Sequence, residues 1–166
     1  MISHKMEFEM ENYKLRATAE GKIERYYEYK TKPHIWKEMK GGKDRQGYLR
    51  ILLSLSSGKR MFYLHRLVYY AYNQDWDIWD SSWNNVIDHR DGNPINNKIG
   101  NLQNITQQQN NFNNHIAKGY TFDEKTGKYK AQIKLDGKNN YLGEFDTPEE
   151  AREAYLEGKE EYHIIP

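Results

Sequence analysis

Residues 86–115 read VIDHRDGNPINNKIGNLQNITQQQNNFNNH, and the order of elements in this stretch decides the fold of the chain. Residues 85–89 and 101–105 are short runs with the composition of strands. The segment between them contains Asp-Gly and Asn-Pro, which are typical of a turn-rich loop. Thr106 and Gln109 form a Thr-x-x-Gln capping box, which predicts a helix that begins near Gln107. The expected order of strand, loop, strand and helix favours a folded site over a disordered polar linker.

Asp88, His89 and Asn110 have side chains suited to metal-assisted hydrolysis of a phosphodiester. The Asp88 carboxylate and the Asn110 amide oxygen are hard donors, and two such ligands leave positions on Mg²⁺ open for water and phosphate. The ordinary pKa of histidine is about 6.5, so a neutral imidazole can accept a proton from an attacking water at physiological pH. Neighbouring residues on a regular strand face opposite sides, so we expect the strand to bend or end at Asp88 and His89.

The set formed by Asp88-His89, Asn101 and Asn110 resembles the HNH endonuclease family, in its phage and intron-homing branch. The resemblance implies a ββα-metal fold in which His89 is the general base and Asp88 and Asn110 are the metal ligands. It also implies that Asn101 braces the loop by hydrogen bonds and keeps His89 oriented. His115 is the alternative to Asn110 as the last ligand. One Mg²⁺ or Mn²⁺ ion per active site is expected, with no organic cofactor.

The segment before this motif predicts a β-hairpin followed by a short helix. Residues 47–55 and 60–65 are strand-like, and SSGK at residues 56–59 forms the turn between them. Residues 65–72 place apolar side chains on one helical face, and this segment also looks like the one that precedes the motif in homing-type members. The three tryptophans of the 73–85 loop are expected to cap a local core, with base stacking as the alternative. Residues 1–30 show no clean period, so no element is assigned to them.

The C-terminal part predicts a three-stranded antiparallel sheet with one helix packed across it. Two glycine-containing turns, DEKTGK and LDGKN, separate three strand-like runs. Thr147, Pro148 and Glu150 then supply the signals with which a helix begins. The ending YLGEFDTPEEAREAY looks like an AP2 DNA-binding domain, with Tyr129 where that domain usually has tryptophan. The chain is therefore expected to be α+β: an HNH domain over residues 1–115, and an AP2-like domain over 116–166.

The charge is unevenly distributed along the chain, although its formal net value is only +1. Residues 1–70 have a net charge of +7, while residues 71–114 and 115–166 have −3 each. A basic half beside an acidic middle predicts a polyanion partner, here double-stranded DNA, next to a cation site; a solvated basic surface is the alternative. In strand 128–135 the alternation places lysine and glutamine on one face, which can enter a major groove, and apolar residues on the other. The candidate DNA-contacting residues are Arg50, Lys59, Arg60, Arg66, Arg90, Lys128, Lys130, Gln132 and Lys134.

Several classes of protein are excluded by composition. The chain has no cysteine, which removes disulfides, zinc–thiolate sites and thiol nucleophiles. No run approaches the roughly 18 apolar residues of a membrane span, and the first residues lack the apolar core of a signal peptide. We therefore expect a cytoplasmic protein with no membrane partner, in a bacterial host if the gene belongs to a phage or an intron.

These patterns together predict a metal-dependent, sequence-selective DNA endonuclease of homing type that cuts or nicks double-stranded DNA. The alternative is a non-catalytic DNA-binding regulator whose HNH-like part is structural, and a third reading is a nonspecific nuclease. The sequence shows no heptad seam, so a monomer or weak dimer is expected. A single active site per chain then makes nicking the natural activity of a monomer.

Overall fold

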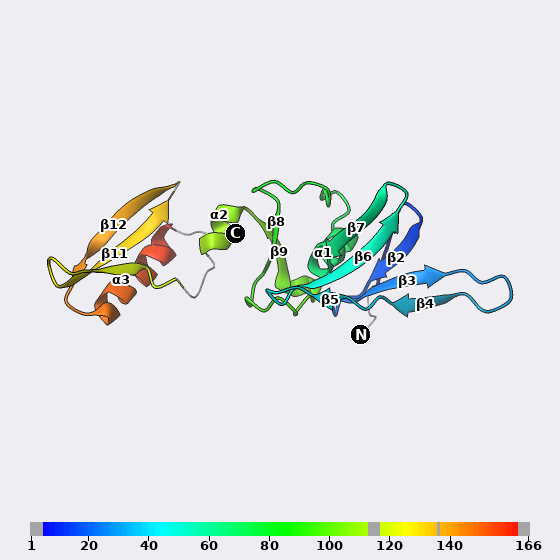
Figure 1. Cartoon of the computed structure of the whole chain (residues 1–166), viewed down its shortest axis with the longest axis horizontal. Coiled ribbons are helices and arrows are strands. Elements are labelled where there is room, and N and C mark those ends of the chain that lie inside the picture. Colours follow the sequence, from blue (N-terminus) through cyan, green and yellow to red (C-terminus); the bar gives the residue numbers. More distant parts are fainter. Residues whose placement is uncertain (1–4, 113–116, 136, 163–166) are drawn as a thin grey trace. The chain divides into compact units, whose positions relative to one another are not determined.

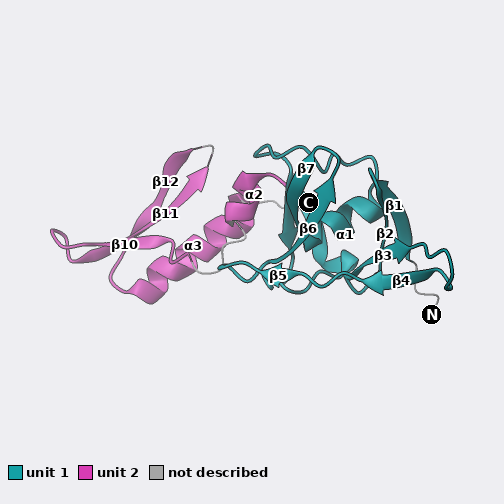
Figure 2. Cartoon of the chain, turned by 45° about the vertical axis from the view of Figure 1, so that its right-hand side comes forward, with its two compact units in different colours: residues 1–104 teal, residues 105–166 magenta. Residues whose placement is uncertain are grey.

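The structure, a computed structural model, describes residues 5–112, 117–135 and 137–162 (Figure 1). The chain forms two compact units, residues 1–104 and 105–166 (Figure 2). The predicted domain boundary between residues 115 and 116 lies outside the described residues and stays a prediction. The mixture of small antiparallel sheets with few helices confirms the predicted α+β class.

The first unit begins with a four-stranded antiparallel sheet that the sequence did not reveal. Its strands are β1 (Met6–Met10), β2 (Tyr13–Ala17), β3 (Ile23–Tyr27) and β4 (Ile35–Glu38), paired in that order. Phe8 and Met10 in β1, and Leu15 and Ala17 in β2, are buried on one face, with exposed or half-buried residues between them. In β3 only Ile23 is buried, which is why the alternation of this region is too short to be recognised.

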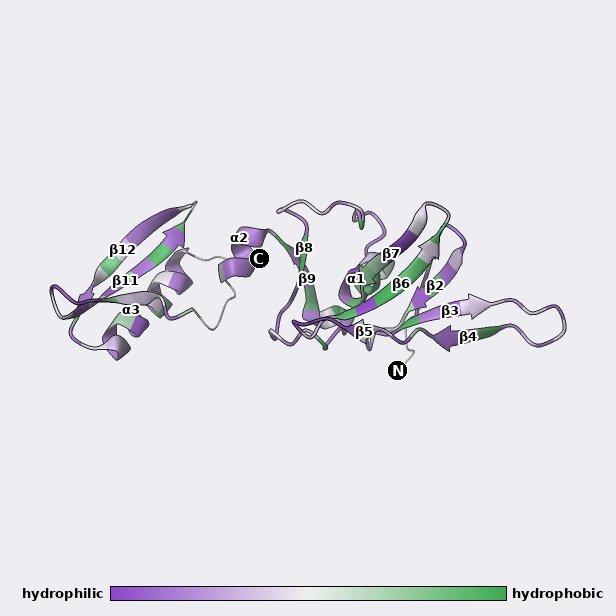
Figure 3. Cartoon of the chain, viewed as in Figure 1, coloured by the Kyte–Doolittle hydropathy of each residue, from purple (hydrophilic) through white to green (hydrophobic). Residues whose placement is uncertain are grey.

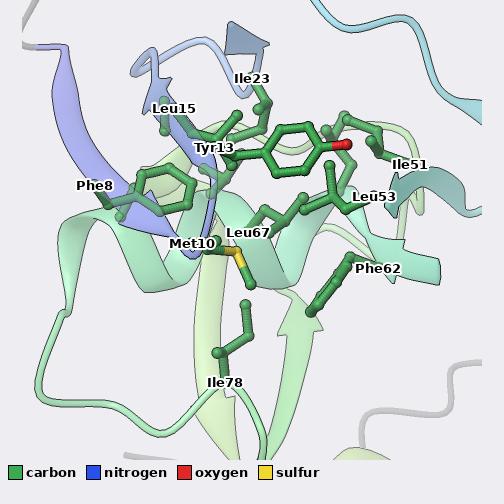
Figure 4. Packing of buried hydrophobic residues seen from close by; sticks show 14 of the residues in the cluster. Phe8, Met10, Tyr13, Leu15, Ile23, Ile51, Leu53, Phe62, Leu67 and Ile78 are labelled. Carbon is green, nitrogen blue, oxygen red and sulfur yellow. The ribbon is translucent and has the colours of Figure 1, made fainter. Parts of the chain in front are cut away.

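The predicted hairpin and helix are confirmed. Strands β5 (Gly42–Lys43), β6 (Leu49–Leu55) and β7 (Gly58–Tyr63) form a three-stranded antiparallel sheet, and α1 (Leu64–Tyr72) follows β7 directly. Strand β6 is apolar along much of its length, as its green colour shows (Figure 3). Leu53, Leu67 and Val68 are fully buried, and they share one core with Leu15 and Ile23 of the first sheet (Figure 4). Burying each such side chain contributes about 1.5–3 kcal/mol, so both sheets and α1 depend on one another for stability.

The tryptophan-rich loop after α1 is anchored by Arg66. Its guanidinium donates to the carbonyls of Ile78 at 3.0 Å, Asp80 at 2.8 Å and Asn85 at 3.0 Å. It also stacks on Trp76, at 4.6 Å from the ring centre, and Trp76 packs against the core. A loop with few apolar residues is held in this way by hydrogen bonds to its backbone.

The three tryptophans of this loop occupy different environments. Trp76 is packed against the core, as predicted. Trp79 packs edge-on against Phe62 and lies under Arg60, whose guanidinium is 4.6 Å from the ring centre. Trp83 is 77% exposed, so the prediction that all three cap a core is wrong for this residue.

The motif itself forms β8 (Val86–His89), the 3-10 turn η1 (Ile99–Asn101), β9 (Leu102–Ile105) and α2 (Gln107–Phe112). Strands β8 and β9 pair as a two-stranded sheet. The capping box is confirmed, because the Thr106 amide donates to Gln109 Oε1 at 2.9 Å and the Gln109 amide to Thr106 Oγ1 at 3.1 Å. Ile87 and Leu102 belong to the core of the first unit, so the two strands are fixed to it.

The second unit is the predicted sheet with one helix. Strands β10 (Tyr120–Asp123), β11 (Lys128–Leu135) and β12 (Lys138–Phe145) are antiparallel in that order, and α3 (Pro148–Tyr162) packs on them. Ala131 and Ile133 of β11 are buried together with Ala151 and Tyr155 of α3, which confirms the predicted apolar face. None of the helices in the described parts of the chain has the length and apolarity that a bilayer crossing requires.

Candidate active site

Strand β8 ends at His89, directly after Asp88. The last hydrogen bond beside the strand joins the Arg90 amide to the Asn101 carbonyl at 2.8 Å, and a turn closes with Gly92 donating to the His89 carbonyl at 2.8 Å. Gly92 has a φ of +68°, a conformation that glycine adopts without strain. Asp88 is half-buried and His89 is buried, so burial still alternates across this pair, and the meeting of the two side chains at one ion stays a prediction.

His89 is held in a buried pair with an asparagine that the sequence reasoning did not single out. Its Nε2 lies 2.9 Å from Oδ1 of Asn97, and the two residues are only 5% and 3% exposed. Asn97 lies in the loop between β8 and η1, where its own Nδ2 donates to the Ile95 carbonyl at 3.4 Å. The ring of the predicted general base thus has a fixed hydrogen-bond partner.

Two further rings surround His89. His65, at the start of α1, meets it edge-on with 5.0 Å between ring centres, and Tyr48 lies 5.8 Å away. Burial lowers the pKa of His65 to about 3, and the neighbouring His89 and Arg66 add to this effect. His65 also stacks on Tyr63, and its Nδ1 has no hydrogen-bond partner among the described residues.

Tyr48 connects this group of rings to Asp88. Burial raises the pKa of the Tyr48 hydroxyl, and the carboxylates of Asp88 and Asp44 raise it further. Tyr48 therefore lies within electrostatic range of Asp88 while its ring contacts His89 and His65. Neither Tyr48 nor the proximity of His65 is visible in the sequence, because both come from the preceding hairpin and helix.

Asn101 spans the loop that carries Asn97. Its Nδ2 donates to Asp91 Oδ1 and to the Asn96 carbonyl, each at 2.8 Å, and its Oδ1 accepts from the Asp91 amide at 3.1 Å. The pKa of Asp91 falls to about 2 because its carboxylate accepts hydrogen bonds from Asn96, the Asn93 amide and Asn101. These bonds hold the loop that carries Asn97, and the role of Asn101 in orienting His89 stays a prediction.

Asp88 is paired across the two strands with Gln103. The Gln103 Nε2 donates to Asp88 Oδ2 at 2.9 Å, and its Oε1 is buried without a hydrogen-bond partner among the described residues. A carboxylate beside an unsatisfied amide oxygen is a set of hard oxygen donors, which suits Mg²⁺ or Mn²⁺. Within the described ranges no group of three or more His, Cys, Asp or Glu residues could hold a metal, so a site here depends on amide oxygens or water as further ligands.

The remaining ligand candidates are not tested by this geometry. Asn110 lies on α2, in the second unit, where it is half-buried and its amide donates to the Thr106 carbonyl at 2.9 Å. His115 lies outside the described residues. The assignment of the last ligand, Asn110 or its alternative, stays a prediction from the sequence motif.

The predicted DNA-contacting residues of the first unit occupy different surroundings. Arg50 and Lys59 lie on the outer face of β6 and β7, without an ion pair among the described residues. Arg50 lines a shallow groove of about 230 Å³ together with Lys40, Lys43, Leu52 and Met61. Arg90 is exposed at the end of β8. The guanidiniums of Arg60 and Arg66 are both stacked on tryptophans, and that of Arg66 is committed to the loop backbone.

The predicted DNA-contacting residues of the second unit share a face on which two of the charges are paired. Lys128 forms an ion pair with Asp146 at 3.1 Å, and Lys130 pairs with Asp123 and Glu144. Gln132 is half-buried and Lys134 is exposed. Part of the positive charge that the sequence places on this face is therefore neutralised by carboxylates on the neighbouring strands or beyond them.

No family model matches the chain. It is 33% identical over 105 residues to the uncharacterized HNH endonuclease L245 of Acanthamoeba polyphaga mimivirus, a match that covers 62% of this chain and 28% of the viral protein. The chain thus spans little more than a quarter of that relative's length. It is also similar to a solved structure on DNA binding and cleavage by the HNH homing endonuclease I-HmuI, with 26% identity and a TM-score of 0.42 over 76% of this chain and 70% of that one. The curated relative supports the resemblance to HNH endonucleases.

Proposed function

We propose that the chain is a divalent-metal-dependent endonuclease that nicks or cuts double-stranded DNA. The observation that carries the proposal is the buried His89, fixed by Asn97 at the end of β8, directly after the carboxylate of Asp88. The similarity to an HNH endonuclease supports it. A histidine held in place beside hard oxygen donors can act as a base toward water, which is what hydrolysis of a phosphodiester requires.

In this proposal His89 removes a proton from a water molecule as the water oxygen forms a bond to phosphorus. The bond between phosphorus and the leaving ester oxygen breaks, and that oxygen takes a proton from solvent. A divalent ion held by Asp88, with Asn110 as the second ligand from the sequence motif, would stabilise the negative charge on the phosphate and on the leaving oxygen. Asn101 keeps the loop in shape through its hydrogen bonds to Asp91 and Asn96.

Duplex DNA is the proposed partner because cations on the outer face of β6 and β7 form no ion pair with other described residues and can meet phosphates. Arg50 and Lys59 lie there, together with the groove that Lys40 and Lys43 line. We propose that the second unit, in the manner of an AP2 domain, adds sequence selectivity typical of a homing enzyme, through Gln132 and Lys134 of β11. The chain would act as a monomer or weak dimer, and one site per chain makes nicking its basic activity.

A plasmid-nicking assay tests this function. Purified protein with Mg²⁺ or Mn²⁺ should convert supercoiled plasmid containing a cognate site to the nicked form, and EDTA should stop it. His89→Ala should lower the rate by about 100-fold or more, as expected for loss of a general base, while DNA binding without metal is retained. His34→Ala, which removes an exposed imidazole on the β3–β4 hairpin, is the matched control and should leave cutting unchanged. Salt-sensitive binding with no cut product under any of these conditions would instead support the DNA-binding regulator.

A further inference from the structure

The amide of Asn97 has one orientation that satisfies both of its neighbours. Its Nδ2 donates to the Ile95 carbonyl, which leaves Oδ1 directed at Nε2 of His89 at 2.9 Å. The opposite orientation would place an oxygen against the carbonyl oxygen of Ile95. The two side chains are almost fully buried, so water does not compete for this hydrogen bond. In such a site an unsatisfied polar atom costs about 1–3 kcal/mol, which keeps the pair intact.

We propose that Asn97 is a positioning residue that holds His89 in the Nε2–H tautomer and thereby makes Nδ1 the nitrogen that accepts the proton. An amide oxygen only accepts hydrogen bonds, so the nitrogen that it contacts must be the donor. A neutral imidazole has one N–H, and the lone pair is then on Nδ1. The inference rests on the proposed function for the role of Nδ1, but the tautomer follows from the hydrogen bond alone.

The backbone around Asn97 is wedged against the turn between β2 and β3, so the amide cannot move away from the ring. Gly21 in that turn has a φ of +84°, and a Cβ added to it would lie 2.3 Å from the backbone carbon and oxygen of Asn97. The Ile99 amide also donates to the Ala19 carbonyl at 3.2 Å. At its other end the loop is tied by Asn101. The N-terminal sheet therefore fixes the position of a hydrogen-bond acceptor for the candidate base.

When Nδ1 takes the proton from water, the ring becomes a cation and Nε2–H continues to donate to Asn97. Hydrogen bonds from an ionised donor are roughly twice as strong as neutral ones, so this contact stabilises the product of proton transfer more than the resting ring. In the other tautomer Nε2 would carry the lone pair. That lone pair would point into a buried amide, where no water could give up a proton.

The first test reads the tautomer directly in metal-free protein without DNA. Nitrogen NMR of labelled protein distinguishes a protonated from an unprotonated ring nitrogen, at a pH high enough for a neutral ring. We expect His89 in the wild type, and in Asn97→Asp, to show Nε2–H and an unprotonated Nδ1. Asn97→Leu, which has a similar volume and no acceptor, should give a mixture of both tautomers. Asn96→Leu disturbs the loop through its bond to Asp91 without touching the ring, and should keep the wild-type signature.

The second test measures nicking by the same variants. Asn97→Leu should lower kcat by about 10- to 100-fold, the usual effect of removing the partner that orients a functional histidine, with KM for DNA within about twofold of wild type. Asn97→Asp should retain more activity than Asn97→Leu because it keeps an acceptor. Circular dichroism and urea unfolding of each variant separate misfolded protein from inactive protein.

The outcomes separate this inference from the proposed function. Nδ1–H in the wild type, or an Asn97→Leu variant with wild-type tautomer and kcat, would overturn the positioning role even if the enzyme cuts DNA. A wild type with the Nε2–H tautomer that cuts no DNA would overturn the proposed function, and with it the role of Nδ1 as base. A tautomer that changes together with kcat in Asn97→Leu, and a wild-type tautomer in Asn96→Leu, support both.

Discussion

Acidification should destabilise the first unit through His65. This side chain is 7% exposed, and its burial holds the pKa near 3, whereas the pKa of a histidine in an unfolded chain is about 6.5. Above pH 6.5 the ring is neutral in both states and contributes no pH dependence. As the pH falls from 6.5 toward 3, the unfolded chain binds a proton that the folded protein excludes, so the free energy of unfolding falls.

The size of the effect follows from the interval between the two pKa values. A pH of 4.5 is about two units below the pKa of the ring in the unfolded chain, while the ring in the folded protein is still neutral. Each unit of this difference corresponds to about 1.4 kcal/mol of stability. His65 alone therefore removes about 3 kcal/mol of stability between pH 7 and pH 4.5. That is a large share of the roughly 5–15 kcal/mol by which a domain is stable.

Urea unfolding of the wild type and His65→Phe, each at pH 7 and pH 4.5, measures this contribution. Phenylalanine keeps a ring for the stack on Tyr63 and removes Nδ1, which has no hydrogen-bond partner in the described part of the chain. Because both proteins carry the same carboxylates, the difference between their two pH dependences gives the contribution of His65, including its interaction with His89. His34→Phe, at an exposed site, should lose as much stability as the wild type. If His65→Phe also loses as much as the wild type, burial does not keep His65 neutral, and the reasoning fails.

Two further predictions concern stability alone. Gly119→Ala should destabilise the second unit, because a Cβ at this position would lie 1.9 Å from the ring of Tyr155. Gly127 also has a positive φ, but its surroundings are open, so Gly127→Ala should cost only the backbone strain of about 1–2 kcal/mol. Measured by thermal unfolding, the Gly119→Ala variant should be about 1–3 kcal/mol less stable than the Gly127→Ala variant. Equal stabilities would mean that the Tyr155 ring moves aside freely. Arg66→Leu removes three hydrogen bonds to loop carbonyls and should lower the free energy of unfolding by on the order of 2 kcal/mol. Urea unfolding measures this loss, and an unchanged midpoint would show that the loop does not depend on Arg66 for its stability.

The elements that were predictable from the sequence are those that local signals determine. The hairpin ending at Tyr63, the helix after it and both capping boxes depend on residues close together in the chain. The sheet of residues 6–38 was not predictable, because its strands are four or five residues long and become recognisable only when paired. Short strands gain their stability from cross-strand packing, which a single sequence does not display.

The candidate site shows the same division. Asp88 and His89 stand out because a carboxylate and an imidazole have chemistry of their own. Asn97 and Gln103 do not stand out in a stretch crowded with amides, since an amide gains a role only from the partner it meets. The contact of His65 with His89 joins residues that are far apart in sequence, so no local pattern predicts it.

The contact of the β2–β3 turn with the Asn97 loop limits how this protein can be rebuilt. Gly21 and Ala19 touch the loop directly, and Leu15 and Ile23 belong to the same core as Ile87 and Leu102. A chimaera in which residues 6–38 are exchanged for the corresponding part of another protein would need a matching loop from that protein as well. The first sheet and the loop that carries Asn97 should therefore be transferred together, with glycine kept at position 21.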